Sequence, residues 1–200
     1  AAASRRNVAA RPAAVRPARD YYEPTLQPQL TVVRLQDSQS GSSQASLVLR
    51  FNPGQTTLRE RLTSQIALSA YSRQMRRQKS ELPVEVSSLV VRKSDIGKTT
   101  QALGLFADVM PDGHAVALTV LLREQERMRR YGLSYVDIAA VKEDIRDVAG
   151  RMAQKEEQRE FAEWVQKVST DWAQDRPYTG SQQRGREALA LLDSIDNQQV

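Results

Sequence analysis

Few side chains in this sequence can act as a nucleophile, a general base or a metal ligand. Its 200 residues include one histidine, His114, and no cysteine, which excludes disulfides, thiolate metal sites and cysteine nucleophiles. No second histidine stands at helical spacing from His114, so a zinc site of the usual kind is not expected and His114 is interpreted as a surface or capping residue. The Gly-x-Ser-x-Gly pattern of a nucleophile elbow is also absent. We therefore predict that this chain has no catalytic, no cofactor-binding and no metal-binding residue.

Three charged or glycine-containing segments resemble functional patterns but lack an essential part. Gly97-Lys98-Thr99 matches the end of a phosphate-binding loop, yet the position that such a loop fills with glycine is Arg92. The acids Glu143, Asp144 and Asp147 are interleaved with the bases Lys142 and Arg146. Such alternation is typical of a solvated helix face rather than a carboxylate pair. The run from Arg123 to Arg130 is explained by helical pairing around one carboxylate. The expected pairs join Glu126 to Arg123, Arg129 and Arg130.

The positive charge is concentrated at the beginning of the chain. The net charge is +5 with a pI of about 9.7, and residues 1–19 contain five arginines and no acid: Arg5, Arg6, Arg11, Arg16 and Arg19. The remainder is formally neutral, with 24 basic and 24 acidic residues. Because residues 1–28 are rich in Ala, Arg and Pro, we interpret them as a linker or flexible arm. Binding of an anionic partner by this arm is the functional alternative.

Membrane insertion is not expected. A spanning helix needs about 20 consecutive apolar residues, and the longest such run here covers only residues 115–122. The start of the chain also lacks the pattern of a signal peptide. The absence of cysteine leaves the compartment open.

Residues 29–200 follow the pattern of one α+β domain. Strands are predicted at 30–35 and 45–51, followed by a helix from Thr57, with a capping box to Glu60, to about residue 78. A hairpin over 84–109 precedes helices at about 113–131, 134–155, 161–175 and 182–193. The segment 161–175 is either a further helix or a kinked continuation of the helix before it. We predict a mainly antiparallel sheet of about four or more strands, with helices packed on one face and the flexible arm 1–28 in front.

The helices are predicted to be amphipathic. The first helix after the hairpin has a largely apolar stripe of Leu118, Leu121, Leu122, Gln125 and Met128. The second has an apolar stripe of Ile138, Val141, Ile145, Val148 and Met152. Trp164 and Trp172 share a face of a later helix, which is typical of anchors in a core or a domain interface.

Two adjoining segments carry a family resemblance. Residues 127–134 (RMRRYGLS) join a basic helix end to a Gly-hydrophobic-Ser sequence, and residues 137–146 (DIAAVKEDIR) begin the next helix with an acid and include Ala140-Val141-Lys142. Later parts of the same pattern match at 159–164, 176–180 and 191–196. Over about residues 28–200 the sequence resembles the second, non-catalytic, C-terminal domain of the pitrilysin or insulinase family of zinc metallopeptidases.

The resemblance implies a role beside a catalytic domain. Catalytic members of the family carry an inverted His-x-x-Glu-His zinc motif in a preceding domain, and this chain lacks that motif, so zinc is implied for a domain elsewhere in the parent protein. The paired domains of the family enclose a chamber that holds an extended peptide. By analogy, this domain would form one chamber wall with an exposed strand edge for the substrate backbone. The family's transition-state Arg and Tyr pair has no matching position in this sequence.

We therefore expect a non-catalytic domain of a zinc metallopeptidase. Its expected partners are an upstream catalytic-type domain or second subunit and an extended peptide substrate; membranes and nucleic acids are not expected. One alternative is a degenerate, chaperone-like relative that binds peptides without proteolysis, and the other is a module that binds anionic partners through its arginines. The family resemblance and the absence of cysteine are compatible with a bacterial periplasmic location.

Overall fold

The computed structural model describes residues 22–37, 39–54, 56–154, 160–173 and 179–200. Within them, three strands form one antiparallel sheet in the order β1-β3-β2: β1 (Ser43–Phe51), β2 (Val86–Asp95) and β3 (Gln101–Val109). The helices are α2 (Leu58–Arg77), α3 (His114–Tyr131), α4 (Tyr135–Gln154), α5 (Phe161–Ala173) and α6 (Ser181–Leu192), with short 3₁₀ turns η1 (Gln78–Glu81) and η2 (Asn197–Gln199). The predicted α+β class is confirmed.

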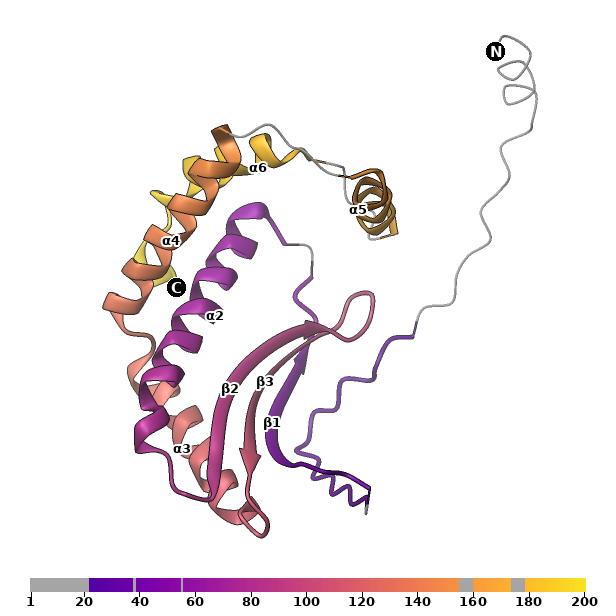
Figure 1. Cartoon of the computed structure of the whole chain (residues 1–200), viewed down its shortest axis with the longest axis vertical. Coiled ribbons are helices and arrows are strands. Elements are labelled where there is room, and N and C mark those ends of the chain that lie inside the picture. The colour runs from indigo at the N-terminus through magenta and orange to yellow at the C-terminus, as the bar shows by residue number, and fades with distance from the viewer. Residues whose placement is uncertain (1–21, 38, 55, 155–159, 174–178) are drawn as a thin grey trace, which may run out of the picture.

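One face of the sheet packs against α2 and α3, as Figure 1 shows. Side chains alternate between the two faces of a strand, so the cross-strand row Leu47, Leu105 and Val91 points toward the helices. A buried cluster joins this face to α2 and α3: Met75, Val86, Leu89, Val91, Leu105, Ala107, Val109, Ala117 and Leu121. The expectation of helices on one face is confirmed.

A second helical layer covers α2 on the side away from the sheet (Figure 1). There α2, α4 and α6 share a core with the turn that follows α6: Leu62, Ile66, Ala70, Ile138, Val141, Leu192 and Ile195. Gly185 allows α6 to approach α4 closely, because a Cβ at this position would lie 2.6 Å from the carbonyl oxygen of Ala149. The helix α2 is therefore packed on both of its long sides.

Local signals in the sequence set several element ends correctly. Thr57 and Glu60 form the predicted capping box, with the Thr57 N–H donating to Glu60 Oε2 at 2.7 Å. Gly132 ends α3 with a φ of 63°, a left-handed conformation that glycine adopts without a Cβ clash. The predicted hairpin is also present, although β2 continues to Asp95 and its turn comes slightly later than expected.

The expected strand at residues 30–35 is wrong. Its large apolar side chains are 72% to 90% exposed, and none of these residues joins the sheet. Local β propensity needs a partner strand and a covered face to produce a stable strand, and the described chain supplies neither here. The sheet consequently has three strands among the described residues rather than four or more.

The predicted apolar stripe of α3 is partly wrong. The buried positions are Ala117, Leu121 and Glu124, whereas Leu118 and Leu122 are about half exposed. The helix is therefore turned so that the small Ala117 faces the sheet. This orientation also buries a carboxylate, which an apolar pattern cannot predict.

The segment predicted as a further helix or a kinked continuation of α4 contains α5. Phe161 is 84% and Trp172 is 59% exposed, whereas Trp164 is partly buried, so an anchoring role for the two tryptophans stays a prediction. Residues 1–21, Arg159 and the stretch 174–178, including part of the family pattern at 176–180, lie outside the described residues. The division into an arm (1–28) and a domain (29–200) stays a prediction.

Candidate functional site

The outer edge of β1 is a candidate binding surface for an extended chain. The strand pairs with β3 along its whole length, and no strand of the described chain lies on its other side. An edge strand presents backbone N–H and C=O groups that are free to pair with another strand. Val48 and Leu49, at 44% and 63% exposure, place apolar side chains at this edge.

A large apolar groove lies beside the same edge. Its volume is about 860 Å³, and its walls come from the sheet, from α2, from the end of α3, from the loop before α4 with the start of α4, and from the C-terminal turn η2. The apolar lining residues from the sheet include Leu47, Leu49, Phe51 and Leu103, and those from the other walls include Leu68, Met128, Leu133 and Ile138. The combination of a free backbone edge and an apolar groove suits an extended peptide.

Lys93 is the one charged side chain among the described residues that line this groove. Its Nζ donates to Ser64 Oγ at 2.8 Å and lies 5.9 Å from the centre of the Phe51 ring. The aromatic face and the hydroxyl hold the cation in position. The groove is thus apolar with one positive charge.

Tyr71 contributes a neutral hydroxyl to the groove wall. Burial raises the pKa of Tyr71, and the nearby carboxylate of Glu124, to which it hydrogen-bonds, raises it further. The phenol therefore stays protonated at physiological pH and is not poised to act as a base.

A buried ion pair fixes the α2 and α3 walls. Glu124 is 5% exposed and accepts two hydrogen bonds from Arg127, at 2.6 and 2.7 Å. Exchanging the amide atoms of Gln74 on α2 would let its oxygen accept from the same guanidinium. Arg127, a member of the family pattern, thus has a structural partner that the sequence analysis missed, since no signal in the sequence marks Glu124 as buried.

The exposed charges of α3 pair largely as predicted. Glu126 accepts hydrogen bonds from Arg129 and Arg130, which lower the pKa of Glu126 to about 2. The expected pair with Arg123 does not form.

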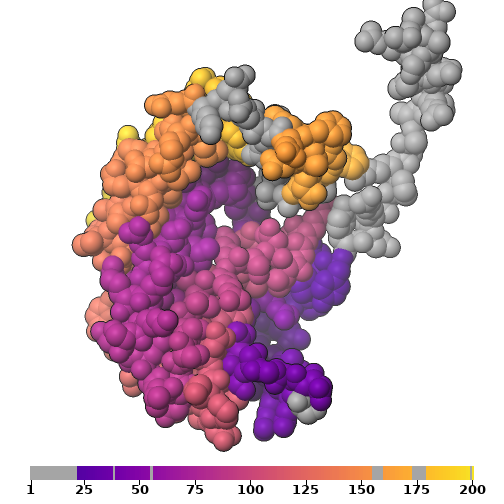
Figure 2. All heavy atoms as spheres, in the orientation of Figure 1, coloured from indigo at the N-terminus to yellow at the C-terminus, as the bar shows by residue number. Residues whose placement is uncertain are grey.

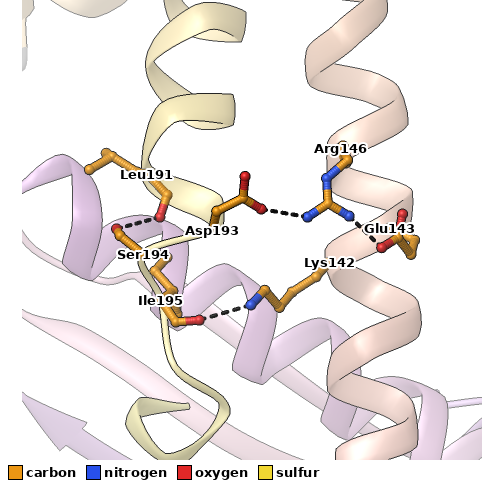
Figure 3. A network of polar contacts seen from close by, with 7 residues as sticks. All are labelled: Lys142, Glu143, Arg146, Leu191, Asp193, Ser194 and Ile195. Atoms are coloured by element: carbon orange, nitrogen blue, oxygen red, sulfur yellow. Dashed lines mark hydrogen bonds and ion pairs between the residues drawn. The ribbon is translucent and has the colours of Figure 1, made fainter.

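The family pattern around Lys142 and that around residues 191–196 meet in space, as Figure 3 shows. Lys142 donates to the carbonyl oxygen of Ile195 at 2.8 Å, and Arg146 bridges to Asp193 at 2.7 Å. Arg146 also pairs with Glu143 on its own helix. Two segments that resembled the family separately are therefore one structural contact, which ties the turn after α6 to α4.

Asp137 has a comparable structural role. It is 1% exposed and receives both terminal guanidinium nitrogens of Arg77. This charged hydrogen bonding raises the pKa of Arg77. Asp137 therefore ties the end of α2 to the start of α4.

The turn that contains Gly97-Lys98-Thr99 binds a carboxylate of the chain itself. The Thr99 N–H donates to Glu23 Oε1 at 2.7 Å, and the Thr100 hydroxyl donates to Oε2 at 2.8 Å. Gly97 makes room, since a Cβ there would lie 2.4 Å from Glu23 Oε2. Desolvation alone would raise the pKa of Glu23, but the hydrogen bonds from Thr100 and Thr99 outweigh it and lower this pKa. The turn therefore anchors the start of the described chain to the sheet.

The described residues do not fit a zinc site. No three His, Cys, Asp or Glu side chains among them lie close enough to hold a metal ion. His114 is exposed at the first position of α3. The expectation that the whole chain has no catalytic, cofactor-binding or metal-binding residue stays a prediction.

The arrangement of the sheet, the two helices on one face and the outer helical layer is a pitrilysin/insulinase-like metallopeptidase fold. The family resemblance is thereby confirmed. No family model matches the sequence, and a search of curated proteins finds no match. Among the described residues, no helix is long and apolar enough to cross a membrane.

Three solved structures define this similarity. A variant of the ferredoxin protease FusC, in complex with Arabidopsis ferredoxin, is 57% identical over 98% of this chain, with a TM-score of 0.85. The periplasmic protease PqqL from Escherichia coli matches 82% of this chain at 15% identity, with a TM-score of 0.71. The matched part is 19% of the length of PqqL. A protein described as a predicted insulinase family protease, from Yersinia pestis, matches 80% of the chain at 12% identity with a TM-score of 0.66, and the match covers 36% of its length. The chain spans only 23% of the length of FusC.

Proposed function

We propose that this chain is a non-catalytic domain of an insulinase-type metallopeptidase and forms part of a chamber that binds peptide substrates. The observation that carries the proposal is the 57% identity to the ferredoxin protease FusC over nearly the whole chain. Zinc and the catalytic residues then belong to an upstream domain or a second subunit. The periplasmic location of PqqL supports a bacterial periplasmic location for the parent protein.

In this proposal the edge of β1 pairs with an extended segment of the substrate. Backbone hydrogen bonds to the free edge supply affinity that does not depend on sequence. Alternate substrate side chains enter the apolar groove beside Leu49 and Leu103, because successive side chains of a strand point to opposite faces. The substrate is thus an extended protein segment with apolar residues at every second position.

Hydrolysis by the chain and by its parent tests the assignment to a peptidase. Each protein is incubated with a mixture of unstructured peptides, with zinc and with a chelator, and the products are measured by mass spectrometry. We expect chelator-sensitive cleavage by the parent only. Absence of cleavage by both would favour the degenerate, chaperone-like alternative, and zinc-dependent cleavage by this chain alone would overturn the proposal.

A second experiment tests the sheet edge. Binding of an extended peptide with alternating apolar residues is compared with binding of the same peptide N-methylated at every second amide. Methylation removes the donors that pair with the edge, so we expect at least about a tenfold loss. Equal affinities would exclude strand pairing, whereas binding that requires residues 1–19 and weakens steeply with salt would favour the anionic-partner alternative.

A further inference from the structure

A second groove, on another side of α2, has different chemistry. Its volume is about 760 Å³, and it lies between α2 and α4, with α6 at one end. Figure 2 shows α2 (purple) and α4 (orange) side by side on the surface. Apolar residues line much of it, including Leu62, Val141, Ile145, Val148, Ala149 and Met152, and Val148 is 47% exposed. We call it the arginine groove.

Four arginines surround this apolar surface: Arg61, Arg73 and Arg76 from α2, and Arg184 from α6. Among the described lining residues, the one carboxylate is Asp144, and it is already paired with Arg73 at 2.5 Å. Arg61 and Arg76 are exposed. The groove therefore has an excess of positive charge at its rim.

Arg184 gives a second indication that the groove binds a negatively charged group of a ligand. Its Nε is buried and has no hydrogen-bond partner among the described residues, while one terminal nitrogen donates to Ser181 Oγ at 3.2 Å. A buried donor without an acceptor costs free energy that a ligand oxygen can recover.

The walls of the groove favour a helix over an extended chain. The groove is bounded by α2, α4 and α6, whose backbone groups within the helices are already hydrogen-bonded. An extended peptide would find no backbone partner there, whereas a helix brings its own hydrogen bonds and can pack its side chains into the groove between two helices.

We infer that the arginine groove docks an acidic amphipathic helix of a partner protein. The apolar face of that helix covers Ile145 and Val148, and its carboxylates face Arg61, Arg76 and Arg184. This surface shares only Leu68, among the described residues, with the lining of the apolar groove beside β1, which we call the β1 groove. The inference does not rest on the proposed peptide role.

The test uses the full chain and three synthetic helical peptides of about 18 residues, or five turns. The peptides share one leucine-rich face, and their other positions are mainly glutamate, glutamine or lysine. Binding is measured by calorimetry. We expect the glutamate peptide to bind with one-to-one stoichiometry, at least about tenfold more tightly than the glutamine peptide, and the lysine peptide not to bind.

A matched pair of variants locates the site. The double variant Arg61→Gln, Arg76→Gln should weaken the glutamate peptide at least about tenfold, while Arg129→Gln, Arg130→Gln removes the same charge from α3, outside the groove, and should leave binding within about twofold. Urea midpoints of both variants verify that they are folded. The Nε–H resonance of Arg184 should shift on addition of the glutamate peptide.

Four binding results would overturn the inference. These are no binding of the glutamate peptide, equal loss in both double variants, equal affinity for the glutamine peptide, and displacement of the glutamate peptide by the extended peptide that probes β1. A nuclear Overhauser contact between the methyl groups of Val168 and Met152 in the free protein would also overturn it, because α5 would then occupy the groove.

Discussion

The two grooves on either side of α2 differ in what their walls offer to a ligand. The β1 groove combines apolar side chains with one free strand edge and one cation, Lys93. The arginine groove is also partly apolar, but its helical walls have no free backbone and its rim has four arginines. We therefore proposed an extended chain for one groove and an acidic helix for the other, because their polar groups differ while their apolar surfaces are similar.

Weakening the packing of α2, the helix that lines both grooves, should cause the largest change, a loss of stability. Ile66 on α2 is completely buried in the core with α4 and α6. Ile66→Ala should lower the free energy of unfolding by about 2–5 kcal/mol, because it deletes buried methyl groups and leaves a cavity. Urea denaturation followed by circular dichroism measures the loss. The control Leu118→Ala changes a half-exposed residue of α3 and should cost less than about 1 kcal/mol; equal losses would contradict the packing described for α2.

A charge placed in the β1 groove should weaken binding there and leave binding at the arginine groove unchanged. Leu49 is 63% exposed and lines the β1 groove. Leu49→Asp should weaken the extended peptide about tenfold or more, since an apolar contact is replaced by a charge that must be desolvated. Fluorescence anisotropy of a labelled peptide measures this, and the acidic helix should bind as before.

The control for that experiment is Leu122→Asp. Leu122 is about half exposed on α3, and it lines neither groove. An equal loss in Leu122→Asp and Leu49→Asp would show that the effect is general rather than local.

Ionic strength should affect binding at the two grooves differently, with a smaller change in affinity than the substitutions cause. Raising salt from about 0.05 M to about 0.5 M should weaken the glutamate helix several-fold to about tenfold, because exposed charges are screened. The extended peptide should change by less than about twofold, since its contacts are backbone hydrogen bonds and apolar side chains. Titrations at both salt concentrations check this, and equal salt dependence would remove the electrostatic distinction between the grooves.

Acidification should have the smallest effect, confined to the turn between β2 and β3. The lowered pKa of Glu23 means that its contact with the hairpin turn stabilises the fold above the ordinary pKa range of glutamate and is lost as pH falls through the lowered folded value. The Thr99 amide resonance, followed from about pH 6 to about pH 2, should therefore titrate below that ordinary range. Glu23→Gln should abolish this titration; a Thr99 signal that still titrates in the variant would refute the contact.

The positions of helices and turns could be predicted because their signals are local. The capping box at Thr57 and the glycine stop at Gly132 both operate within one turn of chain. The family resemblance was also predicted from the sequence, but the contact between two parts of its pattern was not. Lys142 and Ile195 are 53 residues apart in the chain, and only folding shows that they form one contact.

The sequence by itself determined the α+β class, most helix bounds, the hairpin and the family resemblance, because periodicity, caps and order along the chain are properties of neighbouring residues. The tertiary structure decided that residues 30–35 have no partner strand, that Glu124 and Asp137 are buried with arginine partners, and where the two grooves lie. These features depend on surfaces that meet across long separations in the chain. Burial and charge pairing there are settled by packing, which no local pattern encodes.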